Sequence, residues 1–82
     1  MNENEIGQRI HTLRKELKLT MEEFGNKLDV TDALVSMMES GKKAVSKRTR
    51  LAILREFNVN PVWLDTGEGD MFIKLDANKE LA

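Results

Sequence analysis

The feature that most constrains this chain is a set of three residues at fixed spacing: Gly25, Asp29 and Val35. Where two short helices cross closely, the first needs a small residue and the second must return an apolar residue to the crossing. The turn between them needs a residue that tolerates a left-handed backbone. Gly25, Val35 and Asp29 meet these demands at mutually consistent positions. Residues 21–40 are therefore predicted to form two short helices joined by a tight turn, the layout of a helix-turn-helix unit.

The sequence on either side predicts three further helices. Apolar residues at helical spacing predict an amphipathic helix over 6–17,. Apolar residues on more than one face predict a fourth helix over 47–57 that is central to the core. Asparagine followed by proline at 60–61 predicts a fifth helix, which ends before Gly67. Residues 71–75 are predicted to be extended. We therefore expect an all-α fold of five helices, followed by a short extended C-terminal segment.

Several helix boundaries are predicted from capping residues. Thr20 with Glu23 three residues later forms a capping-box pattern at the start of the second helix,. Thr31 and Ser46 are predicted to cap the third and fourth helices. Gly41 is the glycine expected just after the end of the third helix, which we predict over Asp32–Glu39.

Length and composition limit the chain to one small core. A chain of 82 residues is below the usual size of one domain,. We expect one helix-turn-helix domain over 1–75 and a polar tail over 76–82 that would start a linker if a further domain followed. There is no cysteine, so a disulfide or thiolate metal site is excluded and apolar packing must hold the core.

The chemistry of the side chains argues against an enzyme. The chain has one histidine, no Gly-rich phosphate loop and no nucleophile motif,. We therefore expect no metal and no cofactor. We also expect no membrane contact, because no stretch approaches membrane-spanning length. The polar N-terminus carries no signal-peptide pattern, and we expect a cytoplasmic location.

The net charge of −1 conceals an uneven distribution of charge. Between Glu39 and Glu56 every charged residue is basic, whereas acidic residues cluster towards the C-terminus. A basic run is usually a solvated face, but nucleic-acid affinity comes largely from Lys and Arg. The run is therefore also a candidate surface for an anionic partner. Its members are Lys42, Lys43, Lys47, Arg48, Arg50 and Arg55.

The order and spacing of these features resemble those of the phage-repressor and Cro type of helix-turn-helix regulators, the xenobiotic response element family. The resemblance rests on Leu19–Phe24, Val30–Thr31, Val35–Gly41 and the ending Asn60–Gly69, together with Ile10–Arg14. It covers roughly residues 5–73. It implies a lambda-repressor-like DNA-binding domain, with the function of a prokaryotic or phage transcriptional repressor that binds double-stranded DNA sequence-specifically.

The resemblance also implies a role for individual residues. The helix over Asp32–Glu39 would enter the major groove, where base edges are distinguishable. Base contacts are implied for Asp32, Ala33, Ser36 and Met37. Phosphate contacts are implied for Thr20, Thr31, Lys42, Lys43, Lys47 and Arg48. Arg14 and Glu39 match a pair that forms a structural salt bridge in this family.

Two departures from the family pattern affect what can be expected of the interface. The family commonly has a phosphate-clamping glutamine where this chain has Met21,. The expected recognition helix carries no Arg for a bidentate guanine contact, so direct readout should be weak and DNA shape should matter more. The alternative is a helix-turn-helix protein-interaction module, antitoxin-like or an adaptor, with weak or no DNA binding.

A DNA-binding module of this size is expected to work as a homodimer on a palindromic operator, because two modules spaced by one helical turn gain affinity and specificity. The expected contact surface is the last helix with Met71–Leu75, where an exposed apolar strand edge invites pairing.

Three residues outside the expected interface have structural interpretations. Trp63 and Met38 are expected to pack against the core. His11 is expected to lie on the surface, because no carboxylate or cysteine constellation accompanies it in the sequence.

Overall fold

The computed structural model describes residues 3–73, with side chains from Glu5 onward. This part of the chain contains five α-helices and no strand longer than a single bridge, which confirms the predicted all-α fold. The polar tail over 76–82 lies outside the described residues. The helices are α1 (Glu3–Glu16), α2 (Met21–Leu28), α3 (Asp32–Ser40), α4 (Lys47–Phe57) and α5 (Pro61–Thr66).

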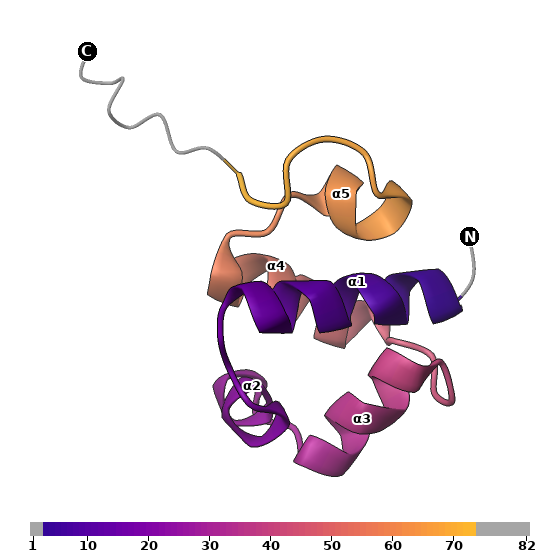
Figure 1. The fold of residues 1–82 in the computed structure, drawn as a ribbon, viewed down its shortest axis with the longest axis vertical. Coiled ribbons are helices and arrows are strands. Elements are labelled where there is room, and N and C mark those ends of the chain that lie inside the picture. Colours follow the sequence, from indigo (N-terminus) through magenta and orange to yellow (C-terminus); the bar gives the residue numbers. More distant parts are fainter. Residues whose placement is uncertain (1–2, 74–82) are drawn as a thin grey trace, which may run out of the picture.

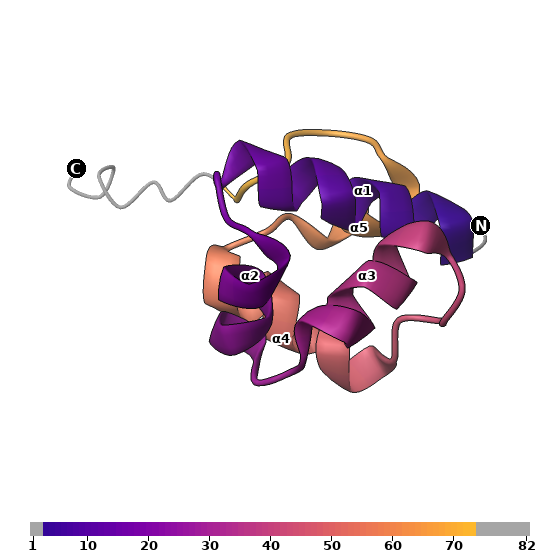
Figure 2. The ribbon, with the colours of Figure 1, turned by 60° about the horizontal axis from the view of Figure 1, so that its bottom comes forward.

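Helix α1 is the central element of the arrangement. It packs against α3 on one side and against α5 on the other, while α2 packs against both α3 and α4. Figure 1 shows α2 and α3 below α1 and α5 above it, and Figure 2 shows α4 beneath α1, close to α2. None of these helices is both long and apolar enough to cross a membrane.

The predicted caps are present in the structure. The Thr20 hydroxyl accepts from the Glu23 N–H at 3.0 Å, and the Thr20 N–H donates to the Glu23 carboxylate at 2.9 Å. Thr31 and Ser46 accept in the same way from the third residue of α3 and α4. Gly41 follows α3 with φ 81°, and α3 ends at Ser40, one residue later than predicted.

A single apolar core lies between the helices. The side chains of Phe24 and Phe57 stack with ring centroids 5.2 Å apart and an interplanar angle of 9°. Met38 is buried, and Trp63 is half-buried against the core, so both expected packing roles are confirmed. The buried apolar residues are Ile10, Leu13, Phe24, Leu28, Val35, Met38, Ile53, Val59 and Leu64.

The first part of the predicted extended segment pairs within the chain. Val59 and Phe72 form an isolated antiparallel bridge. The Asn60 N–H donates to the Met71 carbonyl and the Ile73 N–H to the Asn58 carbonyl, both at 2.9 Å. One edge of this segment is therefore already used inside the protomer, and residues 74 and 75 lie outside the described part.

The crossing of α2 and α3 requires Gly25, although the closest neighbour is not Val35. A Cβ added to Gly25 would lie 2.6 Å from the Val30 carbonyl oxygen and 3.3 Å from Thr31 backbone atoms. The turn residue Asp29 has φ 62°, as its predicted left-handed role requires. The glycine therefore lets the turn backbone fold tightly against α2, while Val35 fills the core beside it.

A second close approach, between α1 and α3, was not predicted. A Cβ on Gly7 would clash with the Met38 carbonyl oxygen and would lie 3.1 Å from that of Glu39. A glycine inside a helix costs about 1 kcal/mol relative to alanine. A glycine at this position of a helix therefore indicates, from the sequence alone, that another backbone segment approaches α1 closely.

Lys18 is the one residue with positive φ that is neither Gly, Asn nor Asp among residues 3–73. Its φ is 61°, in the link between α1 and α2. The left-handed backbone conformation costs most L-residues about 1 kcal/mol, and it costs Asn or Gly less. We therefore expect Lys18→Asn to stabilise the protein by about 0.5 to 1 kcal/mol in urea unfolding. A matched Lys15→Asn variant, within α1, should instead destabilise slightly.

Candidate nucleic-acid interface

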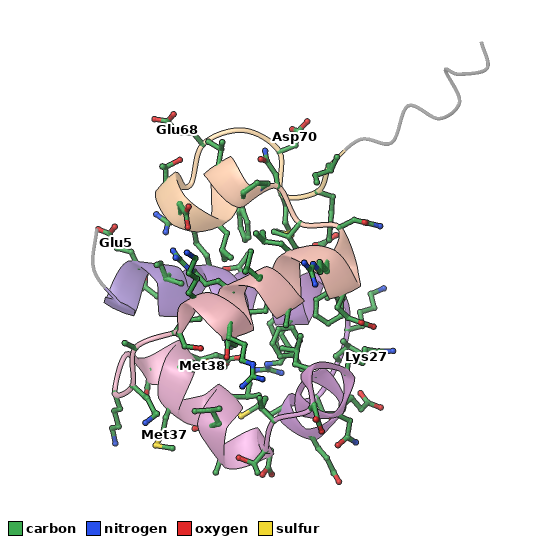
Figure 3. All side chains as sticks on the ribbon, turned by 180° about the vertical axis from the view of Figure 1, so that it is seen from behind. Glu5, Lys27, Met37, Met38, Glu68 and Asp70 are labelled. Carbon is green, nitrogen blue, oxygen red and sulfur yellow. The ribbon has the colours of Figure 1, made fainter. Side chains whose placement is uncertain are left out.

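Helix α3 presents one side to solvent and the other to the core. Asp32, Ala33, Ser36 and Met37, the four residues expected to contact bases, are all exposed. Val35 and Met38 are buried on the opposite side of the helix. Figure 3 shows the Met37 side chain pointing away from the molecule, in contrast to its buried neighbour Met38. The capped start of α3 and its exposed residues therefore form one accessible surface.

The loop that follows α3 is attached to the end of the same helix. The N–H groups of Lys42 and Lys43 both donate to the Met37 carbonyl, at 2.9 and 3.2 Å, and the Ser40 hydroxyl donates to it at 3.2 Å. The side chains of Lys42 and Lys43 are exposed, and neither forms an ion pair with a described residue. The backbone that carries these two cations is thus held at a fixed position relative to α3.

The first two residues of α4 face different parts of the molecule. Arg48 lines a hollow with Ser46 and Thr49, against the α2–α3 turn at Asp29 and Val30. Lys47 instead lines a groove between α4 and α5. The four cations expected to contact phosphates are therefore not a single cluster: Lys42, Lys43 and Arg48 lie with the end of α3 and the turn, whereas Lys47 lines the groove beside α5.

Thr20 and Thr31 lie at the starts of the two helices of the unit. Each hydroxyl accepts a hydrogen bond from its own helix, which leaves the hydroxyl hydrogen to donate to a phosphate,. The first N–H groups of a helix attract anions, but Glu22 and Glu23 are exposed in the first turn of α2, and Asp32 in that of α3. The exposed surface is therefore acidic at the helix starts and basic in the loop after α3.

A buried ion pair joins α1 to the end of α3. Arg14 Nε donates to Glu39 Oε2 at 2.6 Å, and Arg14 Nη2 donates to Glu39 Oε1 at 3.1 Å. The two side chains are only 8% and 6% exposed. Arg14 Nη1 also donates to the Leu19 carbonyl at 2.9 Å. One guanidinium group therefore holds α1, the link to α2 and the last turn of α3 together.

His11 extends this ion pair through a contact that was not predicted from the sequence. Its ring is half-exposed, as expected, but Nδ1 lies 2.8 Å from Glu39 Oε1, so the expectation that no carboxylate accompanies it was wrong. The fold brings together residues 28 positions apart, and no sequence spacing signals that. Burial acts to raise the pKa of Glu39, but hydrogen bonds from Arg14 and His11 outweigh it and the pKa is lowered. The hydrogen bond to Glu39 raises the pKa of Arg14.

Other chemistry has little support in the described residues. No group of three or more His, Cys, Asp or Glu side chains within residues 5–73 is placed to hold a metal ion. The Arg14, Glu39 and His11 cluster is joined by its own hydrogen bonds and ties α1 to the end of α3. The arrangement presents an exposed helix, α3, flanked by hydroxyls and free cations. Such a surface suits a polyanion that has a groove for the helix.

Comparison with known proteins agrees with this geometry. A family model described as helix-turn-helix matches residues 10–64, about two thirds of the chain. The match runs from the middle of α1 into α5 and includes the α2–α3 unit. No curated protein and no solved structure matches the chain. The chain belongs to the helix-turn-helix family of DNA-binding transcriptional regulators.

Proposed function

We propose that this protein is a transcriptional repressor of the phage-repressor and Cro type, which binds a palindromic operator as a dimer in a prokaryotic or phage setting. The observation that carries the proposal is the attachment of the α3–α4 loop to α3. Because Lys42 and Lys43 are hydrogen-bonded to the Met37 carbonyl, a phosphate contact by the loop would fix the position of the exposed α3 residues in the groove. Repression then follows if the occupied operator overlaps a site that other proteins need.

Sequence readout would come from α3 in the major groove. The Asp32 carboxylate can accept from the N4 amine of cytosine, and Ala33 and Met37 can contact the methyl group of thymine. Ser36 is exposed and can donate or accept,. With no cation on α3, the bases contribute few charged contacts, so sequence-dependent DNA shape should supply part of the specificity.

Phosphate contacts would come mainly from one side of this surface. Lys42, Lys43 and Arg48 are exposed and have no ion-pair partner in the described part of the chain. The hydroxyls of Thr20 and Thr31 would add neutral contacts. The acids at the helix starts would keep the number of phosphate contacts small, which favours a modest rather than a steep dependence on salt.

A protein-interaction module is the second candidate function. It is favoured by one observation: α3 presents the methionine Met37, 38% exposed, and the exposed acid Asp32, without any basic residue. Such a surface suits a protein partner as well as a thymine-rich groove. The two functions differ in their response to salt, because a regulator that contacts phosphates must lose affinity as salt rises.

The proposed phosphate contacts are tested with the double variant Lys43→Ala with Arg48→Ala. Removing two phosphate contacts is expected to weaken binding by a similar factor on all duplexes and to reduce the slope of log affinity against log salt by about 1.8. The measurement is a fluorescence titration of duplex DNA at several salt concentrations. Arg55→Ala, which removes an exposed cation near the C-terminal end of α4, is the matched control and should leave the slope unchanged.

The proposed base contacts are tested on the same duplexes with Asp32→Ala and Met37→Ala. Each is expected to change which sequences are preferred, and Met37→Ala should leave the salt slope unchanged. If the lysine and arginine variants changed the preference and the α3 variants changed nothing, the assignment of contacts would be reversed.

A further inference from the structure

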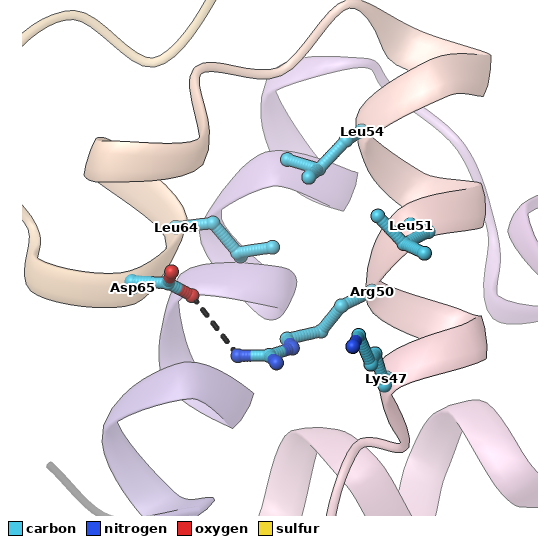
Figure 4. Close-up of a pocket in the computed structure, with 6 residues that line it drawn as sticks. All are labelled: Lys47, Arg50, Leu51, Leu54, Leu64 and Asp65. Atoms are coloured by element: carbon cyan, nitrogen blue, oxygen red, sulfur yellow. Dashed lines mark hydrogen bonds and ion pairs between the residues drawn. The ribbon is translucent and has the colours of Figure 1, made fainter.

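The exposed side of α3 carries a thioether group. Four large apolar side chains are exposed among the described residues: Met37, Leu51, Val62 and Ile73. Leu51 lines the groove between α4 and α5 (Figure 4), and Met37 is the member of this set that lies on α3. The other three side chains are hydrocarbons. Met37 therefore differs from them in having a chemically reactive atom, its sulfur.

The other methionines in the described part of the chain are less accessible. Met38 is 1% exposed in the core, whereas Met37 is 38% exposed and its side chain points away from the molecule (Figure 3). Met21 and Met71 are partly buried and pack against the core. The chain has no cysteine, so no thiol competes with these thioethers for an oxidant. Because an oxidant must reach the sulfur atom, Met37 should react first among these four methionines.

The position of Met37 determines what its oxidation would change. Met37 and Ala33 are both exposed and lie one turn apart, so they form an apolar part of the exposed side of α3,. The Met37 carbonyl accepts from the N–H groups of Lys42 and Lys43 and from the Ser40 hydroxyl, so the backbone at this residue is fixed. Oxidation converts the apolar thioether into a polar sulfoxide. It would therefore change the chemistry of the exposed surface without requiring a change in the fold.

We propose that Met37 is an oxidation site through which peroxides lower the affinity of α3 for DNA. The Met37 sulfur attacks one oxygen of hydrogen peroxide, so that an S–O bond forms while the O–O bond breaks. The second oxygen takes the proton of the transferred oxygen and leaves as water. The sulfur loses two electrons, which reduce the peroxide, and the product is methionine sulfoxide.

The effect on binding rests on the proposed function, in which Met37 contacts the methyl group of thymine. A methyl group offers no hydrogen-bond donor to the sulfoxide oxygen of an oxidised Met37. That oxygen would lose its water on binding without gaining a partner, and burial of an unpaired polar group is unfavourable. Oxidation is therefore expected to weaken binding most at sites where thymine faces Met37.

The first test maps the oxidised sulfur. The protein is treated with increasing amounts of hydrogen peroxide, and fragment-ion mass spectrometry follows each methionine separately. We expect Met37 to be oxidised at least about tenfold faster than Met38, and also ahead of Met21 and Met71. A duplex enriched from a random pool by the untreated protein should slow the oxidation of Met37 but not that of Met71, because binding and oxidation disfavour one another. Oxidation of any of the other three before Met37 would overturn the inference.

The second test separates Met37 from the other methionines. Met37→Leu keeps an apolar side chain of similar volume that peroxide does not oxidise, and Met71→Leu is the matched control. After peroxide treatment, the affinity of the wild type and of Met71→Leu for the enriched duplex is expected to fall about tenfold. The affinity of Met37→Leu should stay within about twofold of its untreated value. Both methionine sulfoxide reductases, supplied with a dithiol as reductant, should restore the wild-type affinity.

A polar variant and an unfolding measurement complete the test. Met37→Gln places a polar amide on α3 without any oxidant, and its affinity should resemble that of the oxidised wild type. The urea unfolding midpoint of the oxidised wild type should equal that of the untreated protein, because changes at exposed side chains have small effects on stability.

Two results of the binding measurements would also overturn the inference. One is undiminished DNA affinity of protein that is oxidised at Met37, and the other is an equal loss of affinity in peroxide-treated Met37→Leu. Failure of the untreated protein to bind any duplex would instead contradict the proposed function, and the effect on DNA affinity with it. The mass spectra decide separately whether Met37 is the first methionine to be oxidised.

Discussion

Replacing Glu39 with alanine is expected to destabilise the fold by about 3 to 5 kcal/mol, measured by urea unfolding. The substitution leaves the buried Arg14 guanidinium, 8% exposed, without its carboxylate partner. An uncompensated buried charge is among the costliest defects that one substitution can create. Because Arg14 also holds the Leu19 carbonyl, the link between α1 and α2 should loosen together with the end of α3.

The matched control is Asp65→Ala, which removes the carboxylate of the more exposed Arg50–Asp65 pair, whose side chains are 34% and 47% exposed. Exposed pairs contribute about 0 to 1 kcal/mol, so this variant should lose at most about 1 kcal/mol. Equal losses in the two variants would show that burial of the Arg14–Glu39 pair does not matter, and the account of how α3 is held in place would then be wrong.

The same ion pair gives stability a defined dependence on pH. The pKa of Glu39 is lowered in the folded protein, so its contribution is fully present above the ordinary glutamate value of about 4.3 and is lost as pH falls through the folded pKa. Glu39→Gln removes this contribution at every pH. The difference in unfolding free energy between wild type and Glu39→Gln should therefore be largest near neutral pH and should shrink below about pH 4. A constant difference down to pH 2 would contradict this.

Alanine at Gly25 or at Gly7 is expected to destabilise the protein by about 2 kcal/mol. In an open helix the same change would stabilise by up to about 1 kcal/mol, because alanine is the better helix former. Here the added Cβ would meet the Val30 carbonyl oxygen at 2.6 Å, or the Met38 carbonyl oxygen in the case of Gly7. Both obstacles are backbone atoms, which cannot rotate away as a flexible side chain can.

Asn26→Ala, at an exposed position of α2 next to Gly25, is the control for the glycine variants and should be neutral or slightly stabilising. Thermal and urea unfolding of the three variants measure the effect. If Gly25→Ala were as stable as Asn26→Ala, the close approach of the turn to α2 would not be required, and the helix-turn-helix alignment would lose its main structural support.

Much of the fold could be predicted because local rules decide its boundaries. Thr20, Thr31 and Ser46 accept hydrogen bonds from their own helices, and such caps depend on residues only three positions apart. Asp29 and Gly41 have left-handed backbones, as the turn and the helix end required. The side of α3 that reaches solvent was also predictable, since it follows from which residues must be buried.

The contacts that sequence reasoning missed join residues far apart in the chain. The approach of His11 to Glu39 and that of Gly7 to the Met38 carbonyl both depend on how α1 packs against α3. The position of Lys47 beside α5 depends on how α4 and α5 pack, and a charge run in the sequence cannot show that its members face different directions. These placements depend on tertiary packing, and no pattern within the sequence of one helix indicates them.

The central claim is that α3 and the loop after it bind duplex DNA sequence-specifically. It is tested most directly by selecting bound sequences from a random duplex pool and then titrating the enriched duplex at two salt concentrations. The account expects an enriched motif with two-fold symmetry and an affinity that falls as salt rises. No enrichment together with no binding at low salt would contradict it and would favour a protein partner at Asp32 and Met37.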